Sequence, residues 1–165
     1  MIRHATQDDK EAVFQIFQEA SQNFKAQNIN QWQGEYPNIE NVLLDIEQNG
    51  AFVYENGGEI LGYFFLTFEA DPNYSKIYVG DWLSTKPYGV LHRIVVKSTA
   101  KRQGVGQKIF DYAKTIAQLK HSNMRIDTHK QNVPMINLIE KNNYTYCGTI
   151  FVEDKTERLA YELIL

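Results

Sequence analysis

The segment from Val90 to Lys120 constrains the fold more than any other part of this sequence. Its first residues, Val90 to Val96, form a nearly continuous apolar run, which is typical of a central strand covered on both faces. A short polar turn follows and closes at Gly104-Val105-Gly106. Apolar residues then recur every four positions, which predicts a helix. The segment therefore has the pattern of a strand, a glycine turn and a helix.

This glycine turn is a candidate anion site. The first turn of a helix carries N–H groups without partners and a partial positive charge, and glycine lets an anion approach them. Four cations surround the turn without an intervening acid: Lys97, Lys101, Arg102 and Lys108. A plainer interpretation stands beside this one, because glycine also punctuates ordinary turns and basic residues often form a solvated face.

The length and charge of the chain limit the possible classes of protein. We expect residues 1–165 to form a single domain with a substantial core. The net charge of −3 argues against a broad nucleic-acid or membrane-surface footprint, so a local patch must meet any anionic ligand. The only cysteine, Cys147, excludes an internal disulfide, and no leader or membrane-length apolar run is recognisable. These features predict a cytoplasmic protein.

The remaining sequence alternates between helical and extended patterns. A capping box, Thr6 to Asp9, follows a short first strand, and the helix after it has one apolar face. Asn38 is expected to start a second helix, and the Gly57-Gly58 turn to join two strands. A strand at 124–128, a helix opened by Pro134 and a closing hairpin complete the order. This order predicts a mixed α/β sheet with helices on both faces, a three-layer α/β/α sandwich.

Two blocks of the sequence resemble the GNAT superfamily of acetyl-CoA-dependent N-acetyltransferases. The first is Ile94-Val-Val96 followed by Lys101-Arg-Gln-Gly104-Val-Gly106, which is similar to the acyl-CoA signature of the family. The second runs from Asn132 to Tyr144 and is similar to a later family block. The resemblance extends over nearly the whole chain. It implies a predominantly antiparallel sheet in which a central parallel pair of strands splays apart to admit the cofactor arm.

The resemblance also implies roles for individual residues. Backbone N–H groups of the turn would hold the pyrophosphate of acetyl-CoA, strand residues would pair with the pantetheine arm, and Asn132 would bind that arm from the second strand. The N–H of Val95 or of its neighbour would face the thioester oxygen. The implied cofactor-binding residues are Ile94, Val95, Val96, Lys101, Arg102, Gln103, Gly104, Val105, Gly106, Gln107, Asn132 and Met135.

The sequence departs from the family pattern at three of these positions. Lys101 replaces a Gln or Arg, and Asn143 replaces a glycine. Ile139 stands where many members have the Tyr that returns a proton to the leaving thiolate, and Ile cannot donate one. The proton could come from Tyr144, Tyr146 or water, or the thiolate could leave without one. The general acid is therefore left open.

Direct transfer requires a group that accepts a proton from the attacking amine. His92, near the middle of the central strand, is the candidate base, because neutral histidine is abundant at physiological pH. A partly buried histidine bonded to a backbone carbonyl is the plainer alternative. His129 and Asp127 are further candidates, with Asp127 expected to be an ion-pair partner of Arg93 or Arg125. Cys147 is not expected to carry the acetyl group, because no adjacent histidine activates it.

Aromatic residues in the connections are candidate walls of an acceptor pocket: Trp32, Tyr36, Trp82 and Tyr88. Glu35 or Asp81 would attract a cationic amine. The resemblance implies acetylation of a small-molecule or peptide amine. The alternatives are acetylation of a protein lysine or N-terminus, and a non-catalytic acyl-CoA sensor; an ATP-binding module is disfavoured. We expect acetyl-CoA as co-substrate, and no metal, nucleic acid or membrane as a partner. A homodimer formed by pairing of the last strands is left open.

Overall fold

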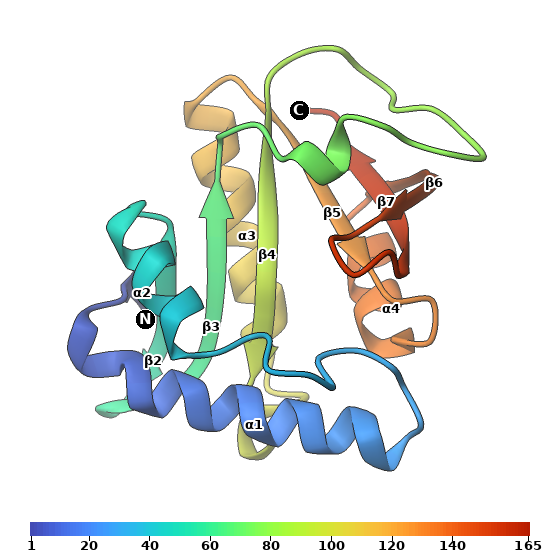
Figure 1. Ribbon diagram of the computed structural model, residues 1–165. Coiled ribbons are helices and arrows are strands. Elements are labelled where there is room, and N and C mark those ends of the chain that lie inside the picture. Colours follow the sequence, from blue (N-terminus) through green and yellow to red (C-terminus); the bar gives the residue numbers. More distant parts are fainter. The chain divides into compact units, whose positions relative to one another are not determined.

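The computed structural model describes residues 1–165 and consists of seven strands and four α-helices (Figure 1). The sheet order is β1-β2-β3-β4-β5-β7-β6, mostly antiparallel with one parallel pair, β4 and β5. This confirms the predicted mixed α/β fold. The elements are β1 (Ile2–His4), α1 (Lys10–Ala26), α2 (Ile39–Glu47), β2 (Ala51–Asn56), β3 (Glu59–Thr67), β4 (Tyr88–Val96), α3 (Val105–Leu119), β5 (Asn123–Thr128), α4 (Val133–Lys141), β6 (Thr145–Phe151) and β7 (Glu157–Leu163).

The chain contains two compact units, which we describe separately. Unit 1 comprises Met1–Leu66 and Arg93–Tyr112, and unit 2 comprises Thr67–His92 and Ala113–Leu165. The boundaries fall inside β4 and α3, so each of these elements begins in one unit and ends in the other. No helix of the protein combines the length and the hydrophobicity that a membrane-crossing segment needs.

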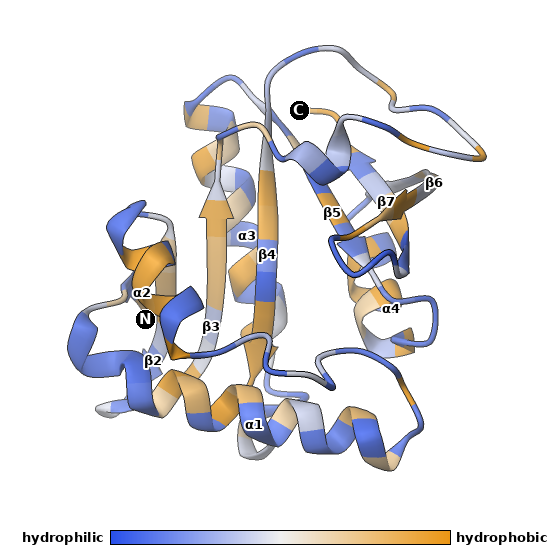
Figure 2. Ribbon diagram, in the orientation of Figure 1, coloured by the Kyte–Doolittle hydropathy of each residue, from blue (hydrophilic) through white to orange (hydrophobic).

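Unit 1 places helices on both faces of its strands. On one face, Val13, Ile16 and Phe17 of α1 pack with Val53 and Tyr63 of the β2–β3 hairpin. On the other face, ring contacts join the hairpin to the first half of α3: Phe52, Phe64 and Tyr112. Figure 2 shows hydrophobic and hydrophilic residues alternating along α1, as its helical period requires. The sequence-predicted apolar face of α1 is therefore confirmed.

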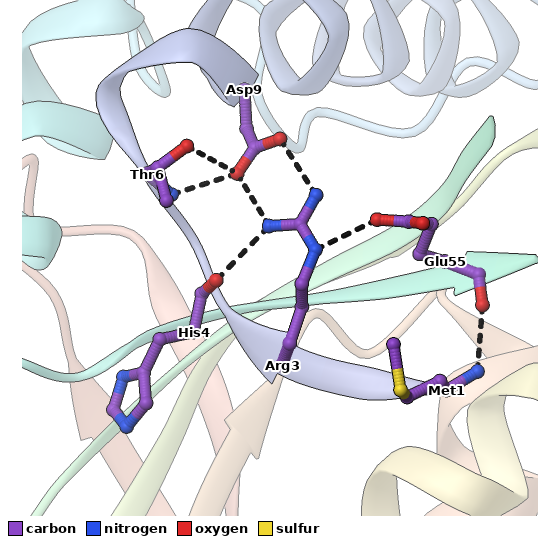
Figure 3. Close-up of polar contacts among 6 residues, drawn as sticks. All are labelled: Met1, Arg3, His4, Thr6, Asp9 and Glu55. Atoms are coloured by element: carbon purple, nitrogen blue, oxygen red, sulfur yellow. Dashed lines mark hydrogen bonds and ion pairs between the residues drawn. The ribbon is translucent and has the colours of Figure 1, made fainter. Parts of the chain in front are cut away.

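The start of α1 is fixed by a polar cluster that Figure 3 shows. The backbone N–H of Thr6 donates to the Asp9 carboxylate at 2.7 Å, as the predicted capping box requires. Arg3 donates two hydrogen bonds to the same carboxylate, at 2.8 and 3.0 Å, and a third to Glu55 of β2 at 2.7 Å. One arginine thus joins β1, α1 and β2.

Unit 2 is built on the antiparallel pairs β5–β7 and β6–β7. Its core includes Tyr74, Val90, Ile150 and Ala160, all almost fully buried. The parallel pairing of β4 with β5 covers only Tyr88–Val90 and Asn123–Arg125, and the next two residues of β4 have no partner in β5. The two strands therefore separate after a short contact, as the predicted splayed pair requires.

Candidate active site

The glycine turn lies between the end of β4 and the start of α3. The backbone is left-handed at Arg102 (φ +62°) and at Gly104 (φ +79°), and α3 begins at the next residue, Val105. A Cβ built on Gly104 would have no atom within 4 Å, so this side of the turn is open. The predicted strand, glycine turn and helix are confirmed, and glycine serves the left-handed conformation without steric cost.

Five consecutive backbone amides of this turn, in residues 102–106, form no hydrogen bond of normal distance and angle with a backbone carbonyl. Backbone hydrogen bonds are present on either side of this run. The N–H of Lys101 donates to the carbonyl of Ser98 at 3.3 Å, and that of Lys108 donates to the carbonyl of Gly104 at 3.0 Å. A run of open N–H groups at the start of a helix is a ready site for an anion, since the helix dipole adds partial positive charge there.

The cations around the turn differ in their pairing. Lys97 forms an ion pair with Glu59 of β3, and Lys108 donates to the hydroxyl of Tyr54 at 3.0 Å. Lys101 and Arg102 form no salt bridge, so their charges remain available to an anion.

Glu19 of α1 binds Ser98, which lies between Lys97 and Lys101. The backbone N–H of Ser98 donates to Glu19 at 2.9 Å, and the Ser98 hydroxyl donates to it as well. These bonds, reinforced by the charges of Lys101 and Lys97, lower the pKa of Glu19. The approach to the turn is therefore anchored to α1 by an ionised carboxylate.

The direction of the N–H groups in β4 indicates which of them could face the thioester oxygen, a role predicted for Val95 or its neighbour. The N–H of Lys97 donates to Leu61 of β3 at 2.8 Å. Because N–H groups two residues apart point to the same side of a strand, the N–H of Val95 is directed toward β3 too. The amides that face the opposite edge are those of Ile94 and Val96. This geometry favours the neighbours of Val95 over Val95 itself.

Arg93 of β4 is the centre of a buried charge network in unit 1. Its backbone is left-handed (φ +50°), and its guanidinium donates to Asp45 of α2, through Nε at 2.9 Å and through a second nitrogen. Tyr63 donates to the same carboxylate at 2.6 Å, and burial followed by the Asp45 charge raises the pKa of Tyr63, so it remains a donor. Arg93 also donates to the hydroxyl of Tyr36 at 2.9 Å and lies over the ring of Phe65.

A cavity of about 600 Å³ lies in unit 1 between α1 and residues 32–40. Trp32 and Tyr36 both line it, as does Glu35, so three of the predicted acceptor residues come together. The indole of Trp32 also packs edge-on against Phe17 and Phe24. Trp32 therefore packs against the core and also lines the cavity.

His92, in unit 2, has a carboxylate partner that the sequence did not indicate. Its Nε2 lies 3.0 Å from the carboxylate of Asp71, and both side chains are largely buried. Asp71 is itself held by the N–H of Asn73 at 2.8 Å, and the ring of Tyr74 lies beside the imidazole. A histidine with a fixed carboxylate partner has one ring nitrogen committed, which orients the other.

The expectation that Asp127 pairs with Arg93 or Arg125 is wrong. Asp127 accepts a hydrogen bond at 2.7 Å from Tyr74, whose pKa is raised well above its usual value by burial and then by the Asp127 charge. Arg93 pairs with Asp45, and Arg125 pairs with Glu162 at 3.0 Å. Each arginine therefore pairs with a carboxylate from another element, and Asp127 forms its hydrogen bond with Tyr74 instead.

Trp82 and Tyr88, the other two predicted acceptor residues, both contact Arg125 in unit 2. The guanidinium lies 4.1 Å from the Trp82 ring centroid and 3.9 Å from that of Tyr88. The indole N–H of Trp82 donates to the carbonyl of Tyr74 at 2.9 Å. Their contact with an acceptor remains a prediction.

The second family block forms α4 and the strand after it. The side chain of Asn132 accepts the N–H of Met135 at 3.3 Å and thereby caps the helix. Ile139 is fully buried, so the position where relatives have a tyrosine belongs to the core here. Of the tyrosine alternatives, Tyr144 is buried, which raises its pKa, whereas Tyr146 is half exposed.

The remaining candidates of the sequence are held in structural roles. His129 is buried and accepts the N–H of Gln131 at 3.1 Å, and burial followed by the charges of Arg158 and Lys130 lowers its pKa. Burial likewise raises the pKa of the Cys147 thiol. No group of three or more His, Cys, Asp or Glu side chains is placed to hold a metal ion.

Sequence reasoning missed Asp45 and Asp71. Asp45 had a usable signal, because it follows Val42 by three residues and adjoins Ile46 on the predicted inner stripe of α2, where a lone carboxylate needs a partner. Asp71 had none, since an Asp-Pro-Asn sequence is ordinary turn chemistry.

Comparisons with known proteins agree with this geometry. The model of the acetyltransferase (GNAT) family matches residues 11–144. An acetyltransferase of the GNAT family from Streptococcus agalactiae is 27% identical, with a TM-score of 0.88 over 100% of this chain and 95% of that one. No protein of curated function matches this sequence.

Two further structures share the fold at lower identity. The PaiA N-acetyltransferase from Thermoplasma acidophilum, solved with coenzyme A, is 16% identical and has a TM-score of 0.74, covering 100% of this chain and 98% of that one. The yncA protein from Salmonella typhimurium, solved with its cofactor acetyl-CoA, is 17% identical and has a TM-score of 0.69, covering 100% and 93%. Since the family model spans most of the sequence, the chain belongs to the GNAT family of acetyltransferases.

Proposed function

We propose that the protein transfers an acetyl group from acetyl-CoA to a primary amine of a small molecule. The observation that supports this most directly is the run of open amides in residues 102–106 beside an unobstructed Gly104. A diphosphate offers oxygen acceptors to several N–H groups at once, and Lys101 and Arg102 add charge. The turn thus suits the diphosphate of acetyl-CoA, which supplies the activated acetyl thioester.

The remaining contacts with acetyl-CoA follow from the family resemblance. Residues 94–96 would pair with the pantetheine arm, and the N–H of Ile94 or Val96 would polarise the thioester carbonyl. One such donor contributes about 10²–10³ in kcat to acyl transfer. Gln107, Asn132 and Met135 complete the predicted binding residues.

The reaction proceeds by direct attack. The amine nitrogen forms a bond to the acetyl carbonyl carbon, the carbon–sulfur bond breaks, and the electron pair of that bond leaves with the sulfur as a thiolate. The proton lost by the nitrogen goes to His92, which Asp71 orients through Nε2 at 3.0 Å. No side chain is assigned to protonate the thiolate, because Ile139 has no proton to donate; a thiolate is a tolerable leaving group, and it takes its proton from water after it leaves.

A small molecule is favoured over a protein acceptor by the cavity in unit 1. Its volume of about 600 Å³ falls in the range of small-ligand sites. A protein lysine would instead require an extended groove along the surface. Residues 32–40 fold against α1 and form a wall of the cavity.

Calorimetric titration with coenzyme A tests the position of the diphosphate site. Gly104→Asp places a Cβ and a negative charge beside the open amides and is expected to weaken coenzyme A binding by at least about tenfold. Gly57→Asp is the matched control, because Gly57 also has a positive φ (+59°) and open space around it, but lies in the β2–β3 turn. Equal affinity in the wild type and both variants would place the diphosphate elsewhere.

Thiol release with acetyl-CoA and a panel of amines tests the transfer itself. We expect release that depends on a small primary amine. Tight binding of acetyl-CoA without turnover of any amine would instead favour a sensor, and preference for ATP over coenzyme A would contradict the donor assignment.

A further inference from the structure

We propose that the cavity between α1 and residues 32–40 binds an organic cation, so that the preferred acceptor carries a second, positively charged nitrogen besides the amine that reacts. This proposal rests on the proposed acetyl transfer and specifies the class of its acceptor. Three features of unit 1 support it: the aromatic wall of the cavity, the sign of its charges, and its connection to β4.

The cavity wall is rich in aromatic rings. Phe14, Phe17, Trp32 and Tyr36 all line it. Aromatic faces carry negative potential and attract ammonium groups, and Trp does so best. Trp32 also has a left-handed backbone (φ +56°), which is an outlier for a bulky residue and costs about 1–3 kcal/mol. Such strain is retained where the position of a side chain matters for function.

Local hydrogen bonds hold this strained segment against α1. The hydroxyl of Ser21 donates to the carbonyl of Trp32 at 2.6 Å, and the side-chain amide of Gln33 donates to the carbonyl of Ser21 at 2.9 Å. The wall is therefore formed in the protein itself, which reduces the entropy lost when a small ligand binds.

The charged groups that line the cavity are both acidic. Glu35 and Glu40 contribute carboxylates, and no Lys, Arg or His lines it. The guanidinium of Arg93, which donates to the hydroxyl of Tyr36, also donates two hydrogen bonds to buried Asp45, so its charge is compensated. Carboxylates together with aromatic faces suit a cation and disfavour an anion.

Tyr36 links the cavity to the strand that would present the thioester. Its ring lines the cavity, and its hydroxyl accepts a hydrogen bond from Arg93 of β4 at 2.9 Å. The residues that would pair with the acyl arm, 94–96, follow directly in the same strand. The wall of the cavity is therefore connected, through one hydrogen bond to the Arg93 side chain, to the strand that is expected to hold the acetyl group.

The chemistry explains why a second nitrogen is needed. The reacting amine must be neutral when it attacks, so its own charge cannot be what the acidic aromatic cavity retains. A second amino or quaternary ammonium group can stay charged throughout the reaction. The cavity would hold this group while the neutral amine reaches the thioester.

A matched pair of ligands that cannot react tests the binding site without any catalysis. Choline and 3,3-dimethylbutan-1-ol have nearly the same shape, but only choline is charged. In ¹⁵N-labelled protein, titration with choline is expected to shift the indole N–H signal of Trp32, with about tenfold higher affinity than the alcohol. The indole of Trp82, which is bonded to a backbone carbonyl, serves as the internal reference.

Variants then identify the charges involved. Combined Glu35→Gln and Glu40→Gln is expected to weaken choline binding several-fold and to leave binding of the alcohol unchanged. Glu47→Gln is the control, since Glu47 is exposed on α2 and does not line the cavity. Equal affinity for choline and the alcohol, or undiminished choline binding by the double variant, would overturn the proposal.

The kinetic comparison uses 1,4-diaminobutane and 1-aminobutane. The diamine is expected to have at least about tenfold higher kcat/KM, and the double variant to lose this preference mainly through KM. Equal kcat/KM for the two amines would refute the proposed acceptor class while acetyl transfer itself stands. Selective choline binding without transfer to any amine would instead support the cation site and contradict the proposed function.

Discussion

His92 has a carboxylate partner from a distant part of the sequence. The Nε2 nitrogen of His92 is engaged by Asp71, which Asn73 fixes in turn. Asp71 thereby fixes the orientation of the imidazole that accepts the proton in the proposed reaction. Asp71 is a positioning residue in this scheme, because it acts through the imidazole and not on the substrate.

Substitution of this pair should separate catalysis from binding. His92→Ala is expected to lower kcat by about 10²–10⁴-fold, the usual contribution of a general base, with coenzyme A affinity unchanged. Asp71→Asn should lower kcat less, because the imidazole remains but loses its orientation. Steady-state kinetics and calorimetry on the same preparations measure both effects.

Glu69→Gln is the control for this experiment, because Glu69 lies two residues before Asp71, is exposed and forms no salt bridge. Full activity of His92→Ala would remove His92 from the mechanism. A fall in activity of Asp71→Asn that Asp71→Glu did not partly restore would indicate a purely structural pair.

At the scale of elements, the Asp9 carboxylate links β1 to the start of α1 through Arg3 and Thr6. Asp9 accepts from Arg3 and from the N–H of Thr6, and both partners come from the chain just before it. The hydrogen bonds of Arg3 lower the pKa of Asp9 below its ordinary 3.8, against the opposing effect of burial, and Thr6 adds to the lowering. This junction is a stability feature of the element and lies outside the proposed chemistry.

Acid should remove the contribution of this carboxylate. A group whose pKa is lowered on folding stabilises the protein above its unfolded pKa, and the contribution disappears as the pH falls through the folded pKa. Asp9→Asn is therefore expected to lower the free energy of unfolding by about 1–2 kcal/mol at pH 7, and by less near pH 3.

Urea denaturation of the wild type, Asp9→Asn and Asp8→Asn at both pH values measures this difference. Asp8 is exposed and serves as the neighbouring control. A difference between wild type and Asp9→Asn that is the same at pH 7 and pH 3 would show that the charge is irrelevant.

At the scale of the whole molecule, a net charge of −3 opposes the binding of an anionic cofactor. The open amides and the unpaired cations of the Gly104 turn must therefore overcome the long-range field of the protein. Local attraction acts over a few ångströms, and salt screens it with a Debye length of about 10 Å at 0.1 M. Coenzyme A affinity should fall as the salt concentration rises.

Two lysines of the turn provide an internal comparison. Lys101→Gln is expected to weaken coenzyme A binding by about threefold at low salt, and by less at high salt. Lys97→Gln should have little effect, because Lys97 is already paired with Glu59. Titration at two salt concentrations measures both variants. Equal losses in the two would show that the pairing of Lys97 does not determine its contribution.

The features that the sequence predicted are those set by neighbouring residues. The left-handed residue that ends α4, Asn143, has a φ of +66°, as expected of an asparagine at that place. The Gly57-Gly58 hairpin and the capping box of Asp9 were likewise recognisable. Propensity, capping and turn chemistry act over a few residues, so a linear pattern is sufficient to predict them.

Ion pairing could not be predicted in the same way. Arg93 and Asp45 are 48 residues apart, and Tyr74 and Asp127 are 53 apart. The chain offers many acids to each arginine, and only packing decides which carboxylate lies within reach. The wrong pairing predicted for Asp127 arose because sequence position alone carries no information about that choice.

The sequence by itself determined the strand, the glycine turn and the helix that suit acetyl-CoA, because a left-handed glycine and a helix start are local properties of the backbone. Only the tertiary structure decided which carboxylate holds His92, which amides stay open, and which aromatic residues line a cavity. Those outcomes depend on distances between groups that are remote in sequence, and folding alone sets these distances.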